Sequence, residues 1–304
     1  MTKTRSLTGE DGFAARDWLV IALVNLMWGL NIVAAKMAVD TISPMTAGFL
    51  RQAMVALACL PWLRFVPGRM AMVLAFSLAS GALMFIPLNL ALATASNMSA
   101  LSVAGQLTAP FSVILSVIFL HERIHMPRII GLCMAFAGVV LIGFDPAMAH
   151  EAAALVLVAL SSLALACGSL AVRKLADVPV ATLYAWLGLI GAVVLGLTGL
   201  IVEREAMAGI ATLPASAFGW VAFSALGSSL VGHGGLAWLL QRHPVGVVMP
   251  YTLIAPVLSV IVSAIMFDAP VTGIMLLGGT IVLAGVAIVT IRTAARGTLA
   301  EELS

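Results

Sequence analysis

Ten long apolar segments dominate this chain and limit what it can fold into. A helix crosses the hydrocarbon core of a bilayer with about 20 predominantly apolar residues. Of the 304 residues, 62% are hydrophobic and only 9% are charged, whereas soluble proteins carry about 25% charged residues. The predicted spans are Trp18–Val39, Pro44–Phe65, Arg69–Ala91, Met98–Leu120, Pro127–Phe144, Ala152–Ala171, Pro179–Val202, Ala215–Leu240, Val245–Phe267 and Val271–Ile291. The sequence therefore predicts an all-α integral membrane protein with ten transmembrane helices, embedded in the lipid bilayer and with almost no soluble domain.

The basic residues predict the orientation of these spans. With the N-terminus in the cytoplasm, twelve Lys and Arg residues lie at inner ends and loops, and Arg204 alone lies outside. Such an excess of inner positive charge is typical of membrane proteins. We therefore expect a multi-pass protein of the bacterial cytoplasmic (inner) membrane, with residues 1–17 and the tail 292–304 both cytoplasmic. The first apolar segment is too long for a signal-peptide core, so we expect it to be retained.

An internal repeat joins the two parts of the chain. Gly81–Glu122 aligns without a gap with Gly227–Asp268, so that "LTAP" (107–110) meets "LIAP" (253–256). One residue of slippage later, "AGV" (137–139) meets "AGV" (284–286). We expect residues 18–145 and 146–291 to form five-helix halves. Because five is odd, the second half would be inverted in the membrane, an arrangement that recurs in secondary transporters.

The same segments resemble a known family. "WGLNIVAAK" (28–36), "SPMTAGFLRQ" (43–52), "LTAPFSVILSVIFLHERI" (107–124) and "AGVVLIG" (137–143) are similar to EamA-type members of the drug/metabolite transporter superfamily. The overall look is closest to the YddG-type exporters of aromatic and other neutral amino acids. The second half departs from the pattern, since "ACGSLAVRK" (166–174) lacks the tryptophan and no arginine matches Arg51.

The resemblance implies an inner-membrane exporter of small metabolites, most of all neutral or aromatic amino acids, that works by alternating access around a central cavity. No Asp or Glu lies deep in a predicted span, which favours facilitated or weakly coupled export, because proton-driven carriers usually keep a buried carboxylate. We expect a monomer without cofactor, metal or nucleic-acid partner. Three alternatives stay open: an exporter of another small metabolite or organic cation, a channel, and an intramembrane enzyme. One H-E-x-x-H match, His121–His125, lies in the connection between the fourth and fifth predicted spans, whereas the zinc-protease motif needs its two histidines on one face of a helix.

His233 is the one histidine within the predicted eighth span, and it stands in "VGHGG" (231–235). In the repeat it falls opposite Pro87, within "FIPLN" (85–89). Paired Gly or Pro interruptions in matched spans indicate a binding site in transporters. Two interpretations remain open: a side chain facing a central cavity, or a neutral histidine bonded to a nearby carbonyl among closely packed glycines. The predicted gating or hinge residues are Pro87, Pro110, Gly232, Gly234 and Pro256.

Polar and aromatic stripes on several spans supply the other candidate residues. Positions three and four apart share one face of a helix, and small residues on such faces also serve plain helix packing. The predicted cavity-lining residues are Asn25, Trp28, Met84, Ser102, Gln106, Ser162, Tyr184, Trp186, His233 and Tyr251.

Two charges lie within the spans themselves. Lys36 is near enough to the outer surface for its ammonium to reach water along its flexible stem. Arg51 is seven residues in from Pro44, so about 10 Å deep. We expect it to pair with backbone carbonyls, polar side chains, cavity water or a substrate carboxylate, and a purely structural role in tying helix ends together is the alternative.

Overall fold

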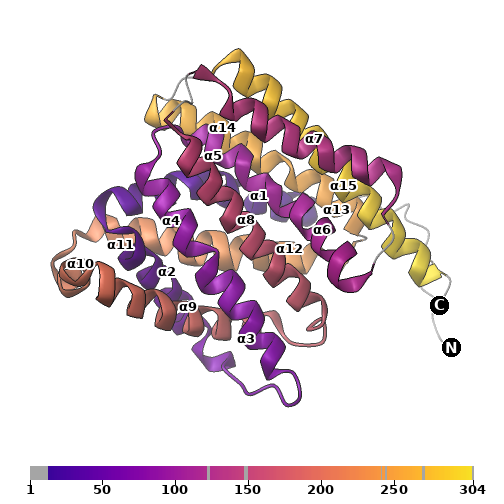
Figure 1. Ribbon diagram of the computed structural model, residues 1–304. Coiled ribbons are helices and arrows are strands. Elements are labelled where there is room, and N and C mark those ends of the chain that lie inside the picture. The colour runs from indigo at the N-terminus through magenta and orange to yellow at the C-terminus, as the bar shows by residue number, and fades with distance from the viewer. Residues whose placement is uncertain are drawn as a thin grey trace.

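Every regular element in the described part of the chain is a helix (Figure 1). The computed structural model describes residues 13–121, 124–146, 150–240, 242–243, 245–268 and 271–302. The long helices are α1 (Ala15–Thr41), α2 (Pro44–Cys59), α7 (Met126–Gly143), α8 (Ala152–Arg173), α9 (Val180–Val202) and α15 (Gly273–Glu302). The interrupted helices are α3 (Met70–Leu78) with α4 (Phe85–Thr94), α5 (Met98–Ala104) with α6 (Thr108–Leu120), α11 (Ala215–Ala222) with α12 (His233–Leu240), and α13 (Val245–Thr252) with α14 (Ile254–Phe267). A short helix, α10 (Arg204–Ala208), follows α9.

Nine helical stretches among the described residues are long and apolar enough to cross a membrane. They correspond to nine of the ten predicted spans, so the prediction of an all-helical, multi-span protein is confirmed. The remaining prediction, 44–65, falls on α2, which has only 16 residues and ends at Cys59. Pro61 contributes to the early end, because proline has no backbone N–H to donate to the carbonyl of Leu57. A 3₁₀ turn, Leu60–Trp62, follows instead.

The last helix extends beyond its predicted end at Ile291. α15 continues through residues 292–302, which the sequence assigned to a tail. This stretch contains alanine, arginine, leucine and glutamate, all strong helix formers. The end of the apolar pattern predicts where the membrane-spanning part ends, whereas the helix itself continues beyond that point.

Two helices carry π-helical turns at matching places in the repeat. One turn, Ala79–Leu83, separates α3 from α4, and the other, Phe223–Gly232, separates α11 from α12. The alignment that pairs Gly81 with Gly227 superimposes them. In the first half Pro87 contributes, because it cannot donate a backbone hydrogen bond to the carbonyl of Leu83. Inside α-helices, π-helical turns are frequent at functional sites.

The next helix of each half is interrupted too. A 3₁₀ turn, Gly105–Leu107, joins α5 to α6 ahead of Pro110. At the matching place α13 ends at Thr252 and α14 begins at Ile254, ahead of Pro256. Each proline leaves a carbonyl in the preceding turn without its usual donor. The breaks in the two parts of the chain therefore occur in one shared register.

Contacts between connecting segments fall into two groups, one at each end of the bundle. At one end, Arg69 Nη1 lies 2.8 Å from Asp177 Oδ1, and His243 Nε2 lies 3.2 Å from Asp17 Oδ2. Arg69, Asp177 and His243 follow the second, sixth and eighth predicted spans, and Asp17 precedes the first. The sequence predicts that all four positions are on the cytoplasmic side. These two contacts thus join connections that the sequence assigns to the same side.

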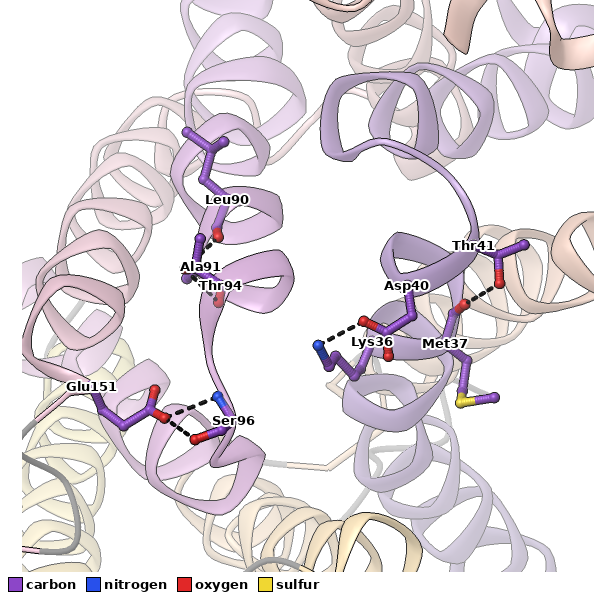
Figure 2. A network of polar contacts seen from close by, with 9 residues as sticks. All are labelled: Lys36, Met37, Asp40, Thr41, Leu90, Ala91, Thr94, Ser96 and Glu151. Carbon is purple, nitrogen blue, oxygen red and sulfur yellow. Dashed lines mark hydrogen bonds and ion pairs between the residues drawn. The ribbon is translucent and has the colours of Figure 1, made fainter.

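At the other end, carboxylates bind backbone and hydroxyl groups of neighbouring helix ends. Glu151 accepts hydrogen bonds from the backbone N–H, at 2.9 Å, and the hydroxyl of Ser96 (Figure 2). Asp145 accepts one from the hydroxyl of Thr272. Glu203 caps α2 by accepting from the backbone N–H of Thr46 at 2.9 Å. Negative charge at a helix N-terminus is favourable because orphan N–H groups point at it.

Two antiparallel pairs frame the bundle (Figure 1). α2 packs along α9, and α7 packs along α15. In the second pair, a Cβ atom added at Gly131 would lie 2.8 Å from the carbonyl oxygen of Gly285, and one at Gly138 would lie 2.6 Å from that of Gly278. Small residues let membrane helices approach closely, and here glycines on both partners permit it.

Candidate functional site

The π-helical turn before α12 meets α1 at the backbone carbonyl of Ser228. Trp28 Nε1 donates to this oxygen at 3.3 Å, and His233 Nδ1 lies 3.1 Å from it. A carbonyl oxygen can only accept, so Nδ1 carries the proton and Nε2 of the neutral ring is free to accept. Because a carbonyl has two lone pairs, both side chains are satisfied at once. One backbone oxygen thus fixes the positions of an indole and an imidazole.

Three rings from three helices gather at this point. The ring centroid of His233 is 5.0 Å from that of Trp28 on α1 and 5.9 Å from that of Tyr184 on α9. His233 is nevertheless exposed, whereas Ser228 beside it is buried. The rings of Trp28 and Tyr184 are partly exposed as well. The contact with Ser228 fits a neutral histidine bonded to a nearby carbonyl, and a side chain facing a central cavity stays a prediction.

Gly232 permits the close approach of the indole. A Cβ atom at this position would lie 2.4 Å from Trp28 Nε1, a distance that real Cβ contacts do not reach. At Gly234, by contrast, nothing lies within 4 Å of an added Cβ atom. The two glycines, paired as hinge candidates by the sequence, therefore have different surroundings.

Arg51 of α2 lies beside the same turn. Its side chain is 9% exposed, and Nη2 donates to Ser229 Oγ at 3.2 Å. The guanidinium carbon lies 4.7 Å from the ring centroid of Phe85 in a cation–π contact. Ser229 directly follows Ser228, whose carbonyl contacts Trp28 and His233. The aromatic group and the buried charge therefore meet the same π-helical turn.

A narrow internal cavity borders Arg51. It has room for about one water molecule. Its wall comes from α1, α2, α4, α11 and the π-helical turn, and consists of Ala35, Ala38, Val39, Ala47, Gly48, Arg51, Asn89, Val221 and Ser224. The cavity-lining residues predicted from the sequence lie on the first, third, fourth, sixth, seventh, eighth and ninth spans. This cavity is bordered by the first, second, third and eighth.

Several predicted cavity residues instead bond within or between neighbouring helices. Asn25 Nδ2 donates to the carbonyl of Ile21 at 2.8 Å, and Ser102 Oγ donates to that of Met98 at 2.9 Å. Ser162 Oγ reaches across from α8 to the carbonyl of Gly105 at 3.2 Å. Such bonds satisfy hydroxyl and amide groups inside a bilayer, where water is absent.

Met84 and Gln106 sit at the helix interruptions. Met84 directly follows the first π-helical turn and packs against Met45, Phe85 and Leu195. Gln106 belongs to the 3₁₀ turn between α5 and α6 and is half-buried.

Two predicted aromatic residues lie away from the His233 group. Trp186 Nε1 donates to the carbonyl of Arg64 at 2.9 Å, in an exposed connection. Tyr251 packs against Phe13 and Trp18, with ring centroids 5.5 and 5.2 Å apart. Both therefore join helix ends to connecting segments, as amphipathic rings with one polar tip often do.

Lys36 is paired within its own helix. Its Nζ lies 2.6 Å from Asp40 Oδ1, one turn further along α1 (Figure 2). Asp40 is the more exposed of the two side chains, at 44% against 15%. The ammonium therefore reaches toward the end of the helix, and Asp40 is its partner there.

Sequence reasoning missed the residues that surround Arg51. Phe85, Asn89, Ser224 and Ser229 were not candidates. These residues come from both parts of the chain, and nothing in their spacing relates them to Arg51. Their polarity in apolar spans was the available signal. Among the described residues, no cluster of three or more His, Cys, Asp or Glu side chains is arranged to hold a metal ion.

The profile of the EamA-like transporter family matches residues 18–144 and 152–291. The chain belongs to this family. The resemblance found in the sequence is thereby confirmed, and membership makes the protein a multi-pass membrane transporter rather than an enzyme.

Individual relatives cover nearly the whole EamA chain. A protein of Escherichia coli (strain K12) described as a probable amino-acid metabolite efflux pump is 24% identical, over 89% of this chain and 93% of its own. An uncharacterized transporter of Archaeoglobus fulgidus is 28% identical, over 90% of this chain and 98% of its own. A crystal structure with 20% identity covers 93% of this chain and 99% of its own with a TM-score of 0.58, which supports the same fold.

Proposed function

We propose that this EamA-family protein exports small metabolites, chiefly aromatic and other neutral amino acids, by alternating access. The observation that carries the proposal is the group of Trp28, Tyr184 and His233, three rings from three helices around an exposed imidazole. Small-molecule sites are typically lined by apolar and aromatic side chains with a few placed polar groups. The E. coli relative, described as a probable amino-acid metabolite efflux pump, supports the same substrate class.

The rings suit a substrate side chain that is itself flat or bulky. Aromatic pairs at centroid distances of about 4.5–7 Å attract each other beyond the area they bury. Trp28 and Tyr184 flank His233 at distances within this range. An aromatic or branched side chain beside the imidazole would therefore contact rings from two helices that move apart when the site opens.

We also propose that the protein consists of two inverted five-helix halves. In the alignment that pairs the two "AGV" segments, Gly131 is equivalent to Gly278 and Gly138 to Gly285. Gly131 approaches Gly285 while Gly138 approaches Gly278. Equivalent helices thus pack antiparallel with equivalent glycines exchanged, as a two-fold axis in the membrane plane requires. The helix breaks in one register support this symmetry further.

The orientation follows from the charges at the two ends. We place both termini in the cytoplasm and the protein in the cytoplasmic membrane of a bacterium. The end that carries Arg69 and His243 is rich in Lys and Arg, whereas carboxylates such as Glu151 and Glu203 gather at the other. Positive charge favours the cytoplasmic side.

Single cysteines test this orientation. In a chain whose native cysteines are replaced, Glu205→Cys and Arg242→Cys are both exposed and lie in connections predicted to be on opposite sides. A membrane-impermeant maleimide added to intact cells should label Glu205→Cys alone, and Arg242→Cys should react after permeabilisation. Labelling of Arg242→Cys in intact cells would reject the orientation.

Substrate counterflow in proteoliposomes tests the function. Proteoliposomes that contain the purified protein and unlabelled phenylalanine should accumulate labelled phenylalanine, leucine and methionine, and this uptake should saturate. They should not accumulate labelled glucose or nucleosides. Tetraphenylphosphonium counterflow without amino-acid counterflow would replace the proposal by organic-cation export. Steady conductance without saturation or counterflow would instead identify a channel.

A further inference from the structure

Arg51 is a buried charge without a carboxylate partner among the described residues. It belongs to none of their ion pairs, and its side chain donates to the Ser229 hydroxyl. The described acidic residues lie at the ends of helices or in connections, as Asp40, Asp145, Glu151 and Glu203 do. A buried cation without a counterion is costly in a membrane, so such residues generally mark a substrate or ion path.

The contacts of Arg51 leave much of its hydrogen-bonding capacity unused. A guanidinium carries five N–H donors in a planar fork. One Nη2 donor reaches Ser229, and Nε is buried with no partner. Phe85 lies against the guanidinium through a cation–π contact, which uses no N–H group. The remaining edge of the fork is therefore available to an acceptor that the chain itself does not supply.

The surroundings of this edge favour a small anionic group. Arg51 forms part of the wall of the narrow cavity, together with Ser224, whose buried hydroxyl also has no partner. The rest of the wall is mostly alanine, glycine and valine, which leave space, together with Asn89, whose Nδ2 donates to the carbonyl of Pro44 at 2.9 Å. A carboxylate matches the fork because its two oxygens accept two parallel N–H bonds. A cationic head group would instead meet a like charge.

We propose that Arg51 binds the carboxylate of the transported substrate, while the substrate side chain lies against Trp28 and Tyr184. This inference rests on the proposed function, because the present cavity is too narrow for an amino acid and must widen during alternating access. It adds a specificity rule: the carboxylate is recognised, and amines that lack it are rejected. Ser229 acts as a positioning residue that holds the guanidinium beside the second half of the protein.

The test uses matched ligands that differ in the carboxylate. Binding to purified protein in detergent is measured by thermal stabilisation for 3-phenylpropionate, which has the ring and the carboxylate, and for phenethylamine, which has the ring and an ammonium. The parent should bind 3-phenylpropionate at least about tenfold more tightly, as expected for a charge-assisted bidentate pair. Equal affinities would overturn the proposal, and this comparison needs no variant.

Variants then assign the preference to Arg51. Arg51→Gln should weaken 3-phenylpropionate binding by about tenfold or more and leave phenethylamine no weaker, while Arg51→Lys retains the charge and part of the preference. Ser229→Ala keeps the guanidinium and should lose only about twofold to threefold. Gel filtration verifies that each variant is folded. A folded Arg51→Gln protein that keeps the full carboxylate preference would overturn the assignment.

Counterflow separates this inference from the proposed function. If the parent carries phenylalanine but Arg51→Gln carries phenylalanine and phenylalaninamide equally well, both stand. If the parent binds 3-phenylpropionate through Arg51 but transports no amino acid, the carboxylate site stands and the proposed substrate class fails. If phenylalanine is transported with the preference for the carboxylate intact in Arg51→Gln, the function stands and the role of Arg51 is rejected.

Discussion

Gly232→Ala is expected to reduce transport by at least about tenfold, whereas Gly234→Ala keeps the rate within about twofold of the parent. The added methyl group at Gly232 would lie 2.4 Å from Trp28 Nε1 and 2.8 Å from its Cδ1. The indole would have to move, breaking its bond to the carbonyl of Ser228. Overpacking of this kind costs about 1–3 kcal/mol, and 1.36 kcal/mol corresponds to a tenfold change in rate.

Gly234→Ala is the matched control, since it adds the same methyl group two residues away, where nothing lies within 4 Å. Alanine also raises helix propensity equally at both positions. Phenylalanine counterflow in proteoliposomes measures both variants, after gel filtration establishes that each is folded. Equal losses would mean that the glycines act through helix flexibility, as the sequence had suggested, and would reject the close-packing explanation.

A second substitution separates crowding from other causes. Trp28→Phe removes the indole N–H edge that the new methyl group would strike, so the double variant Gly232→Ala with Trp28→Phe should recover part of the rate lost by Gly232→Ala alone. Residues in contact are expected to show such non-additivity. Strictly additive losses would argue that Gly232 and Trp28 contribute independently.

The positions of the membrane spans could be predicted from hydropathy and charge. A lipid bilayer requires long apolar helices, independently of how those helices pack against each other. Nine of the ten predictions correspond to described helices of sufficient length, and α2 is shorter, to which Pro61 contributes. The repeat also indicated where helices are interrupted, since proline and glycine act locally. It did not indicate that the interruptions preceding Pro87 and His233 are π-helical turns. That choice depends on which neighbouring groups bind the freed carbonyls.

The composition of the site was harder to predict. Helical periodicity predicts which residues share a face of a helix, but it does not predict which neighbouring helix packs against that face. Trp186 and Tyr251 therefore looked like wall residues, although they pack at helix ends against Arg64 and Phe13. Trp28, Tyr184 and His233 do meet, because the π-helical turn directs His233 toward both rings. Such contacts between distant segments are products of tertiary packing and have no one-dimensional signature.

His233→Leu is expected to slow transport by about twofold to tenfold, and His233→Gln should keep most of the rate. The imidazole donates from Nδ1 to the Ser228 carbonyl, 3.1 Å away. Glutamine can place an amide N–H near the same oxygen, whereas leucine cannot. The net loss of one such hydrogen bond is about 0.5–1.5 kcal/mol, which converts to the stated range of rates. The carbonyl keeps its bond from Trp28, so a larger loss is not expected.

The same two variants decide whether the histidine carries protons. The exposed imidazole has the access that a proton carrier needs, but a carrier must also exchange its proton during the cycle. Glutamine reproduces the hydrogen bond to Ser228 without titrating. Phenylalanine uptake at pH 6 and pH 8 should therefore show the same ratio for the parent and for His233→Gln. If the parent shows a pH dependence that His233→Gln abolishes, proton coupling runs through this imidazole, and its bond to Ser228 is a way of holding the carrier in position.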